Sequence, residues 1–245
     1  ILGAATLEIY LNDGEKERSI LFSGDVGRYA VPLILDPEKP PVTEYFVCES
    51  TYGGEVHQPQ DIFFEFAQLV DKIIEQKSIL LIPAFAVGRT QQIIYILHVL
   101  KKQGRIPEIS VNVDSPMAVR VTDIYKKYNA YNQINDELVK DAKHGFYGKN
   151  VKLHRKRKAS KSLNKLKGPA IIISASGMMN GGRILHHLIN RLPDPITTLL
   201  VPGYQAEGTL GRQILEGADT IYMHKQPVEV NAQIVRMSGL SGHAS

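Results

Sequence analysis

Three side chains that could perform acid–base or metal chemistry follow short apolar runs in this sequence of 245 residues. Asp25 stands in ILFSGDVGR, Glu49 in YFVCESTYGG and His243 in IVRMSGLSGH. Each residue ends an expected strand, so all three could reach one rim and form a metal or general acid–base site. Taken singly, each has a structural alternative, because acidic residues often begin turns and a histidine near a chain end is usually exposed.

The number of metal ligands limits what these residues could do by themselves. A zinc ion takes three or four protein ligands, so an Asp, a Glu and a His are too few to hold it securely. The single cysteine, Cys48, excludes an internal disulfide and a zinc site built from cysteines, and it fits a reducing cytoplasm. The neighbouring His186 and His187 point about 100° apart on an expected helix and cannot easily share one ion.

A second set of residues could bind an anion. In SASGMMNGGR, glycines and small polar residues lie between an apolar strand and a helix, so that several backbone N–H groups could face one point. The predicted contacts in this turn are Ser174, Ser176, Gly177, Asn180, Gly181 and Arg183. Arg89 in PAFAVGRTQ and Arg212 in GTLGRQ stand at corresponding turns, and this recurrence favours an anion-binding edge. The alternative is an ordinary turn whose glycines allow tight packing.

The elements that must position these residues change in type along the chain. TLEIYL and RSILFSGD, joined by the turn NDG, predict a hairpin, and EYFVCES predicts a third strand. From Asp61, a residue suited to cap a helix, an amphipathic helix is followed by four strand–helix units, one of which begins its helix at Ser115 and Pro116. Apolar strands joined by helices predict a parallel sheet covered on both faces.

The predicted fold class is therefore α/β, with a doubly wound parallel sheet inserted into a β-rich domain. The expected boundaries are 1–54 for the first β-rich part, 55–217 for the inserted domain and 218–245 for the return to the β-rich part.

Several familiar α/β chemistries are absent from the sequence. No G-x-G-x-x-G follows a strand, GYQAEGTLG lacks the lysine of a P-loop, and no G-x-S-x-G elbow occurs. Dinucleotide, P-loop and serine-hydrolase functions are therefore excluded. No apolar run approaches the roughly 20 residues that span a bilayer.

The positive charge of the chain is concentrated in one segment. The net charge is +4. The segment VKLHRKRKASKSLNKLKG contains eight Lys and Arg residues and no Asp or Glu. This segment is either a solvated surface or a patch that follows a phosphate backbone.

Taken together and in order, SGD, ESTYG, PAFAVGRTQ, SASGMMNGGR, PGYQAEGTLG and SGLSGHA resemble the β-CASP branch of the metallo-β-lactamase superfamily. More narrowly, they resemble its RNA-processing nucleases, related to the cleavage and polyadenylation specificity factor endonuclease. The resemblance covers nearly the whole chain.

The resemblance implies a role for each motif residue. Asp25 corresponds to the carboxylate that bridges two zinc ions, and Glu49 and His243 correspond to a pair that acts as a general acid in phosphodiester cleavage. The inserted α/β unit would be the β-CASP cap, whose cleft admits single-stranded RNA, with Arg89, Arg183 and the glycine-rich turn near the RNA backbone.

The sequence lacks the His-x-His-x-Asp-His motif and two further ligand histidines of the family. We therefore expect this chain to be a segment of a zinc-dependent ribonuclease that needs two zinc ions, to hold zinc poorly by itself and to be inactive alone. The expected partner is single-stranded RNA, a homodimer is a candidate assembly, no membrane partner is expected and the expected location is the cytoplasm. The alternatives are a non-catalytic RNA-binding or scaffold subunit and a hydrolase of another phosphodiester, such as DNA.

Overall fold

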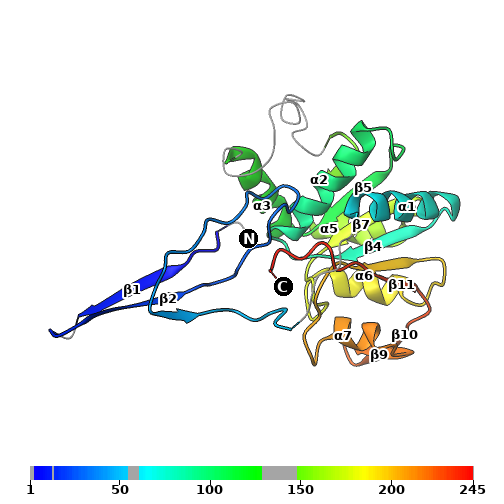
Figure 1. Cartoon of the computed structure of the whole chain (residues 1–245). Helices are drawn as coiled ribbons and strands as arrows, with labels where there is room; N and C mark the ends of the chain where they lie inside the picture. Colours follow the sequence, from blue (N-terminus) through cyan, green and yellow to red (C-terminus); the bar gives the residue numbers. More distant parts are fainter. Residues whose placement is uncertain (1–2, 13, 55–60, 129–147, 245) are drawn as a thin grey trace.

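The computed structural model describes residues 3–12, 14–54, 61–128 and 148–244. In this part of the chain, an α/β body carries a long arm of β-strands that points away from it (Figure 1). The strands are β1 (Leu7–Asn12), β2 (Glu17–Phe22), β3 (Tyr45–Val47), β4 (Ile79–Pro83), β5 (Ser110–Asp114), β6 (Val151–Leu153), β7 (Ala170–Ser174), β8 (Thr198–Val201), β9 (Thr220–Met223), β10 (Gln226–Glu229) and β11 (Gln233–Arg236). The helices are α1 (Ile62–Glu75), α2 (Arg89–Lys102), α3 (Pro116–Lys127), α5 (Arg157–Ser162), the 3₁₀-helix η3 (Leu163–Lys165), α6 (Ile184–Arg191) and α7 (Leu210–Leu215).

The body is built on a parallel sheet of six strands in the order β11-β8-β4-β7-β5-β6. Successive residues of β4 face opposite sides, as the period of two in a strand requires. Leu80 and Ile82 pack on one side with α1, α2 and α3, whereas Ile79 and Leu81 pack on the other side with α6, α7 and β9. Figure 1 shows these two groups of helices on opposite faces of the sheet. The predicted doubly wound α/β sheet is confirmed.

The predicted helix starts are also confirmed. The Asp61 carboxylate accepts a hydrogen bond from Phe64 N at 3.0 Å, and the Ser115 hydroxyl accepts one from Ala118 N at 3.2 Å. Both contacts satisfy amides that a helix leaves without an internal partner in its first turn. They fix where α1 and α3 begin.

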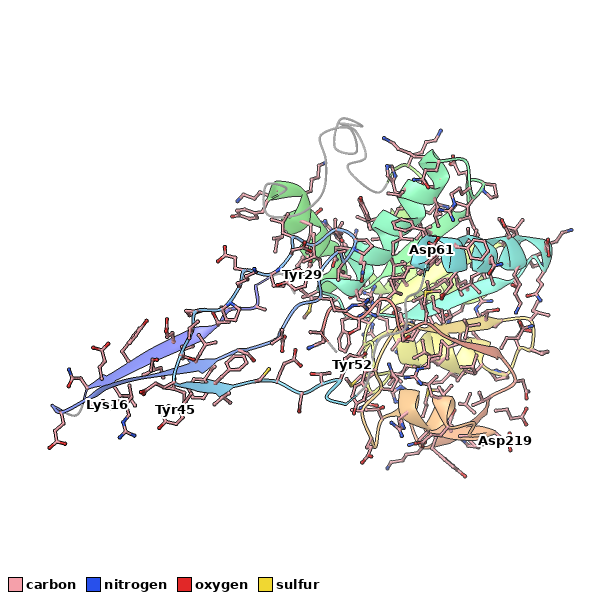
Figure 2. All side chains as sticks on the ribbon, viewed as in Figure 1. Lys16, Tyr29, Tyr45, Tyr52, Asp61 and Asp219 are labelled. Carbon is pink, nitrogen blue, oxygen red and sulfur yellow. The ribbon has the colours of Figure 1, made fainter. Side chains whose placement is uncertain are left out.

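The arm consists of the predicted hairpin and third strand. β1 and β2 pair antiparallel, and β3 adds to β2 in parallel. The Asn12 side chain accepts a hydrogen bond from Gly14 N at 2.8 Å in the turn. Lys16 and Tyr45, labelled in Figure 2, lie on this arm.

The last segment of the chain differs in part from the expectation that residues 218–245 return to the β-rich part. β11 pairs in parallel with β8 and extends the six-stranded sheet, and the hairpin β9–β10 contributes to the core of the body. A four-residue strand carries no local signal of the sheet that it joins, because its pairing is decided by distant residues. After β11 the chain does return, since Ala244 N donates to Val26 O at 2.9 Å. The division into three domains remains a prediction.

Within the residues that the structure describes, no helix combines the length and the apolar character needed to cross a bilayer.

Candidate functional site

A tight turn after β2 presents Asp25. Gly24, the residue before it, has φ +56, and a Cβ built at Gly24 would lie 2.5 Å from Ala5 O. Both the left-handed backbone and the close approach of this carbonyl require glycine. The turn leaves the side chain of Asp25 exposed.

Glu49 and His243 form a hydrogen-bonded pair, although 194 residues separate them in the sequence. The Nδ1 atom of His243 lies 2.8 Å from Oε1 of Glu49. Glu49 is fixed further by Val26 N, which donates to Oε1 at 2.7 Å, and by the N–H and hydroxyl groups of Thr51, which donate to Oε2. The carboxylate therefore has donors on both oxygens and holds the imidazole ring in one orientation.

The surroundings of Glu49 keep it ionised. Burial by itself would raise the pKa of this carboxyl, but hydrogen bonds from Thr51, His243 and Val26 outweigh burial and lower the pKa to about 2. An ionised Glu49 can accept a hydrogen bond from the N–H at Nδ1 of His243 and so orient the ring. A histidine held in this way is suited to donate a proton.

A pocket of about 340 Å³ joins this pair to the body. Its walls come from Tyr52 and His243 on one side and from the carboxyl ends of β4, β7 and β8 on the other, for example Phe85, Gly177 and Tyr204. Tyr52, labelled in Figure 2, lies where the arm meets the body. Crevices outside the carboxyl ends of parallel strands are the usual ligand sites of such sheets.

Arg89, the first residue of α2, lines the same pocket. Its guanidinium lies against Gly203, where an added Cβ would be 3.1 Å from Nη1. Burial lowers the pKa of Arg89 to about 10, and no carboxylate lies within ion-pair distance of it among the described residues. An arginine remains charged under these conditions, so the pocket offers a positive charge to an anionic ligand.

Comparison with known proteins decides the family. The model of the Beta-Casp domain matches residues 90–214, slightly more than half of the chain. This chain belongs to the β-CASP family. The family match runs from α2 to α7, so Asp25, Glu49 and His243 lie outside it. Their expected roles rest on the resemblance of their own motifs to the family.

Curated β-CASP relatives match over nearly all of the chain. "Ribonuclease TTHA0252" of Thermus thermophilus is 35% identical over 234 residues, which are 93% of this chain and 53% of that protein. An "RNase J-like protein" of Methanocaldococcus jannaschii is 34% identical over 247 residues, 97% of this chain and 54% of that protein. "Transcription termination factor FttA" of Methanosarcina mazei is 31% identical over 256 aligned residues, all of this chain and 40% of that protein. The chain thus spans about half the length of the curated relatives it matches.

The glycine-rich turn of this β-CASP domain lies at the pocket only in part. Gly177 lines the pocket, but Ser174 is buried and its hydroxyl donates to Asp114 O at 2.9 Å. The Ser176 hydroxyl donates to Gly181 O, and the Asn180 side chain accepts from Leu210 N. These side chains stabilise the turn, and an RNA contact there remains a prediction.

Of the three arginines at helix starts, Arg183 and Arg212 have carboxylate partners, and the anion-binding edge remains a prediction. Arg183 donates to the Asp114 carboxylate at 2.7 Å and to the carbonyl groups of His154 and Arg155. Arg212 pairs with Glu216, four residues later on α7. Their charges are already compensated, which leaves Arg89 as the arginine of this set that faces the pocket.

Sequence reasoning missed residues that support or line the site. Thr51 holds Glu49, and the ring of Tyr52 packs edge-on against that of Tyr204 with centroids 6.1 Å apart. Thr51 and Tyr52 belong to the ESTYG motif that begins at Glu49, and this position in the motif could have indicated them from the sequence. Asp114 gave no signal, because its partners lie 46 to 73 residues away in the sequence.

The residues present fit part of a zinc site. Asp25, Glu49 and His243 can each offer one ligand atom, and these atoms lie within 4.8 Å of one another. Glu49 is already engaged with His243, Thr51 and Val26, which leaves Asp25 as the carboxylate best placed for a metal. Because zinc takes three or four protein ligands, this cluster does not fit a complete centre of two zinc ions.

Proposed function

We propose that these residues form part of a hydrolase that cleaves phosphodiester bonds of single-stranded RNA with the help of two zinc ions. The observation that carries the proposal is the shared pocket, which is lined both by His243, the partner of Glu49, and by Arg89, a cation without an ion-pair partner among the described residues. A phosphate group is the anion that such a cation and a proton donor would act on together. The names of the Thermus and Methanocaldococcus relatives, a ribonuclease and an RNase J-like protein, support this choice.

His243 is the proposed general acid. In the hydrolysis, the oxygen of a water molecule bonds to phosphorus and releases a proton to solvent, while the bond between phosphorus and the leaving oxygen breaks. His243 donates a proton to that leaving oxygen and is reprotonated from solvent. Glu49 stays ionised throughout and keeps the ring oriented through Nδ1. Arg89 binds the charged phosphate oxygens, and the apolar and aromatic walls around Phe85 and Tyr204 accommodate the neighbouring nucleotide.

Zinc enters this proposal through Asp25, which would be the carboxylate shared by the two ions. Bound zinc would stabilise charge on the phosphate and lower the pKa of water. Since the described residues do not complete such a centre, the chain alone is proposed to bind zinc poorly and to cleave nothing.

The test uses the full-length protein with RNA and DNA of the same sequence, in the presence and absence of a chelator. We expect RNA to be cleaved, activity to disappear with the chelator and with Asp25→Ala, and DNA to be a poorer substrate. Equal cleavage of DNA would contradict the RNA preference, and cleavage that survives chelation would contradict the metal. A further measurement is the zinc content of the 245-residue chain after desalting. Near zero is expected, and close to two per chain would contradict the expectation of an incomplete centre.

A non-catalytic RNA-binding or scaffold subunit is the alternative. The intact Glu49–His243 pair argues against it, because a scaffold has no use for an oriented proton donor beside a pocket. The same assay separates the two, since a scaffold would bind RNA and leave it uncut.

A further inference from the structure

The basic segment, residues 152–167, lies outside the pocket and is not used by the proposed chemistry. All eight of its cationic side chains are exposed, and the segment contains no acidic residue. They are Lys152, Arg155, Lys156, Arg157, Lys158, Lys161, Lys165 and Lys167. Among the described residues, Asp123 is the one carboxylate in ion-pair distance of this set, 2.7 Å from Arg155. The segment therefore presents a dense positive charge, most of which has no carboxylate partner among the described residues.

The first part of the basic segment, residues 154–160, is anchored at the carboxyl edge of the sheet. Ser160, in α5, donates to Oδ2 of Asp114 at 2.6 Å, and Asp114 is the last residue of β5. Arg183 bridges the same carboxylate and the carbonyl groups of His154 and Arg155, at 2.7 to 2.9 Å. The Asp114 side chain is fully buried within these contacts. A buried carboxylate with several charged and hydrogen-bonded partners fixes the elements that it joins.

The same edge of the sheet carries the pocket. Ala84, which lines the pocket, donates through its N–H to Ser174 O at 2.9 Å, and the Ser174 hydroxyl donates to Asp114 O at 2.9 Å. β7 lies between β4 and β5, so the pocket wall and Asp114 are two strand spacings apart, about 10 Å. The basic segment consequently starts at the same edge of the sheet as the pocket, two strands away from the pocket wall.

We propose that the basic segment is a second RNA-binding surface, which holds the phosphate backbone of the strand where it leaves the pocket. Clustered Lys and Arg bind a phosphate backbone by releasing its counterions, without reading the bases. This inference rests on the RNA substrate of the proposed function and adds a site outside the pocket. The surface would favour long substrates over short ones and would make their binding strongly dependent on salt.

The test compares two variants of the full-length protein that lose the same charge. The first carries Lys156→Gln, Arg157→Gln, Lys158→Gln and Lys161→Gln, and it keeps Ser160 and the buried contacts of Asp114. The control carries Gln in place of four exposed lysines elsewhere, namely Lys39, Lys72, Lys126 and Lys225. Binding is measured by fluorescence anisotropy at several salt concentrations, with a short RNA that fills only the pocket and a longer RNA that extends well beyond it.

We expect the first variant to lose about tenfold or more in affinity for the long RNA and to bind it with a smaller salt dependence. Each lost phosphate contact should reduce the slope of log K against log salt by about 0.7. Its affinity for the short RNA and its rate of cleaving it should match those of the unchanged protein. The control variant should match the unchanged protein with both RNAs.

Other results would overturn the inference. Unchanged binding of the long RNA, with cleavage of the short RNA intact, would remove the second surface and leave the proposed function standing; an acidic protein partner would then be the ligand to seek. Equal losses by both variants would show an effect of net charge alone. If the unchanged protein neither bound nor cleaved the short RNA, the proposed function itself would fail.

Discussion

The imidazole of His243 lies 2.8 Å from the carboxylate of Glu49, across 194 residues of sequence. The contact joins the last described turn of the chain to the segment after β3, and it stands at the pocket that contains Arg89. A pair formed over such a separation exists only if the whole intervening α/β domain folds. The chemistry of the site therefore depends on the stability of that domain.

Replacement of His243 by alanine tests the proton donor. We expect His243→Ala to lower the rate of RNA cleavage by the full-length protein about 10²- to 10⁴-fold, the usual contribution of a general acid. The binding of RNA should change much less. Separate determination of kcat and KM distinguishes the effect on the cleavage rate from the effect on binding. His224→Ala is the control, because His224 is an exposed histidine in the turn between β9 and β10 and should have no effect. Equal losses in the two variants would contradict the role.

Arg89 should contribute to binding of the substrate phosphate. Arg89→Gln removes a charged hydrogen-bond donor, and we expect the affinity for RNA to fall roughly 10- to 100-fold. Arg212→Gln is a matched control, since Arg212 also stands at a helix start but is exposed and paired with Glu216. Titration of the protein into labelled RNA gives both dissociation constants. An unchanged affinity for Arg89→Gln would show that its charge does not meet the phosphate.

The buried Asp114 cluster should stabilise the fold. Asp114→Asn leaves Arg183 without its counter-charge and replaces the carboxylate that hydrogen-bonds to His187, and we expect a loss of about 3–5 kcal/mol in the free energy of unfolding. Asp123→Asn, which breaks the exposed pair with Arg155, should cost less than about 1 kcal/mol. Urea denaturation at pH 7 measures both. A small loss for Asp114→Asn would show that the cluster contributes little.

The contribution of Asp114 should also depend on pH. Burial alone would raise the pKa of this carboxyl, but hydrogen bonds from His187, Ser160 and Arg183 lower it below its ordinary value of 3.8. A carboxyl whose folded pKa is depressed stabilises the protein above its unfolded pKa and loses this effect as pH falls through the folded pKa. The difference in stability between the unchanged chain and Asp114→Asn should therefore be complete near neutral pH and shrink below about pH 4. A difference that grows on acidification would contradict this sign.

Glycine at position 24 should be required for the turn that presents Asp25. Gly24→Ala puts a Cβ 2.5 Å from Ala5 O and also strains a backbone with φ +56. Gly14→Ala strains the backbone, because φ is +91, but causes no close contact, because nothing lies within 4 Å of the added Cβ. We expect about 1–2 kcal/mol for Gly14→Ala and a clearly larger loss for Gly24→Ala. Thermal unfolding of both variants checks the order, and equal losses would show that the contact with Ala5 relaxes freely.

The sequence by itself determined the elements and their local ends. The apolar runs of β4 and β7 predicted buried parallel strands, and Asp61 and Ser115 marked the starts of α1 and α3. These features depend on contacts between residues a few positions apart, so their physical cause is present in a short stretch of sequence. The motif residues Asp25, Glu49 and His243 could also be selected, because each interrupts an apolar run with a polar group.

Only the tertiary structure decided which of these residues meet. It placed β11 beside β8 and brought Glu49 to His243. It also paired Arg183 with Asp114, whereas Arg89 lines the pocket. These contacts join residues far apart in the chain, and they form because burying both faces of the six-stranded sheet brings its carboxyl edge and the two outer segments together. Local propensity carries no information about that packing. The pairing of Glu49 with His243 was expected from the family resemblance, whereas the partners of Arg183 and of β11 were not predicted.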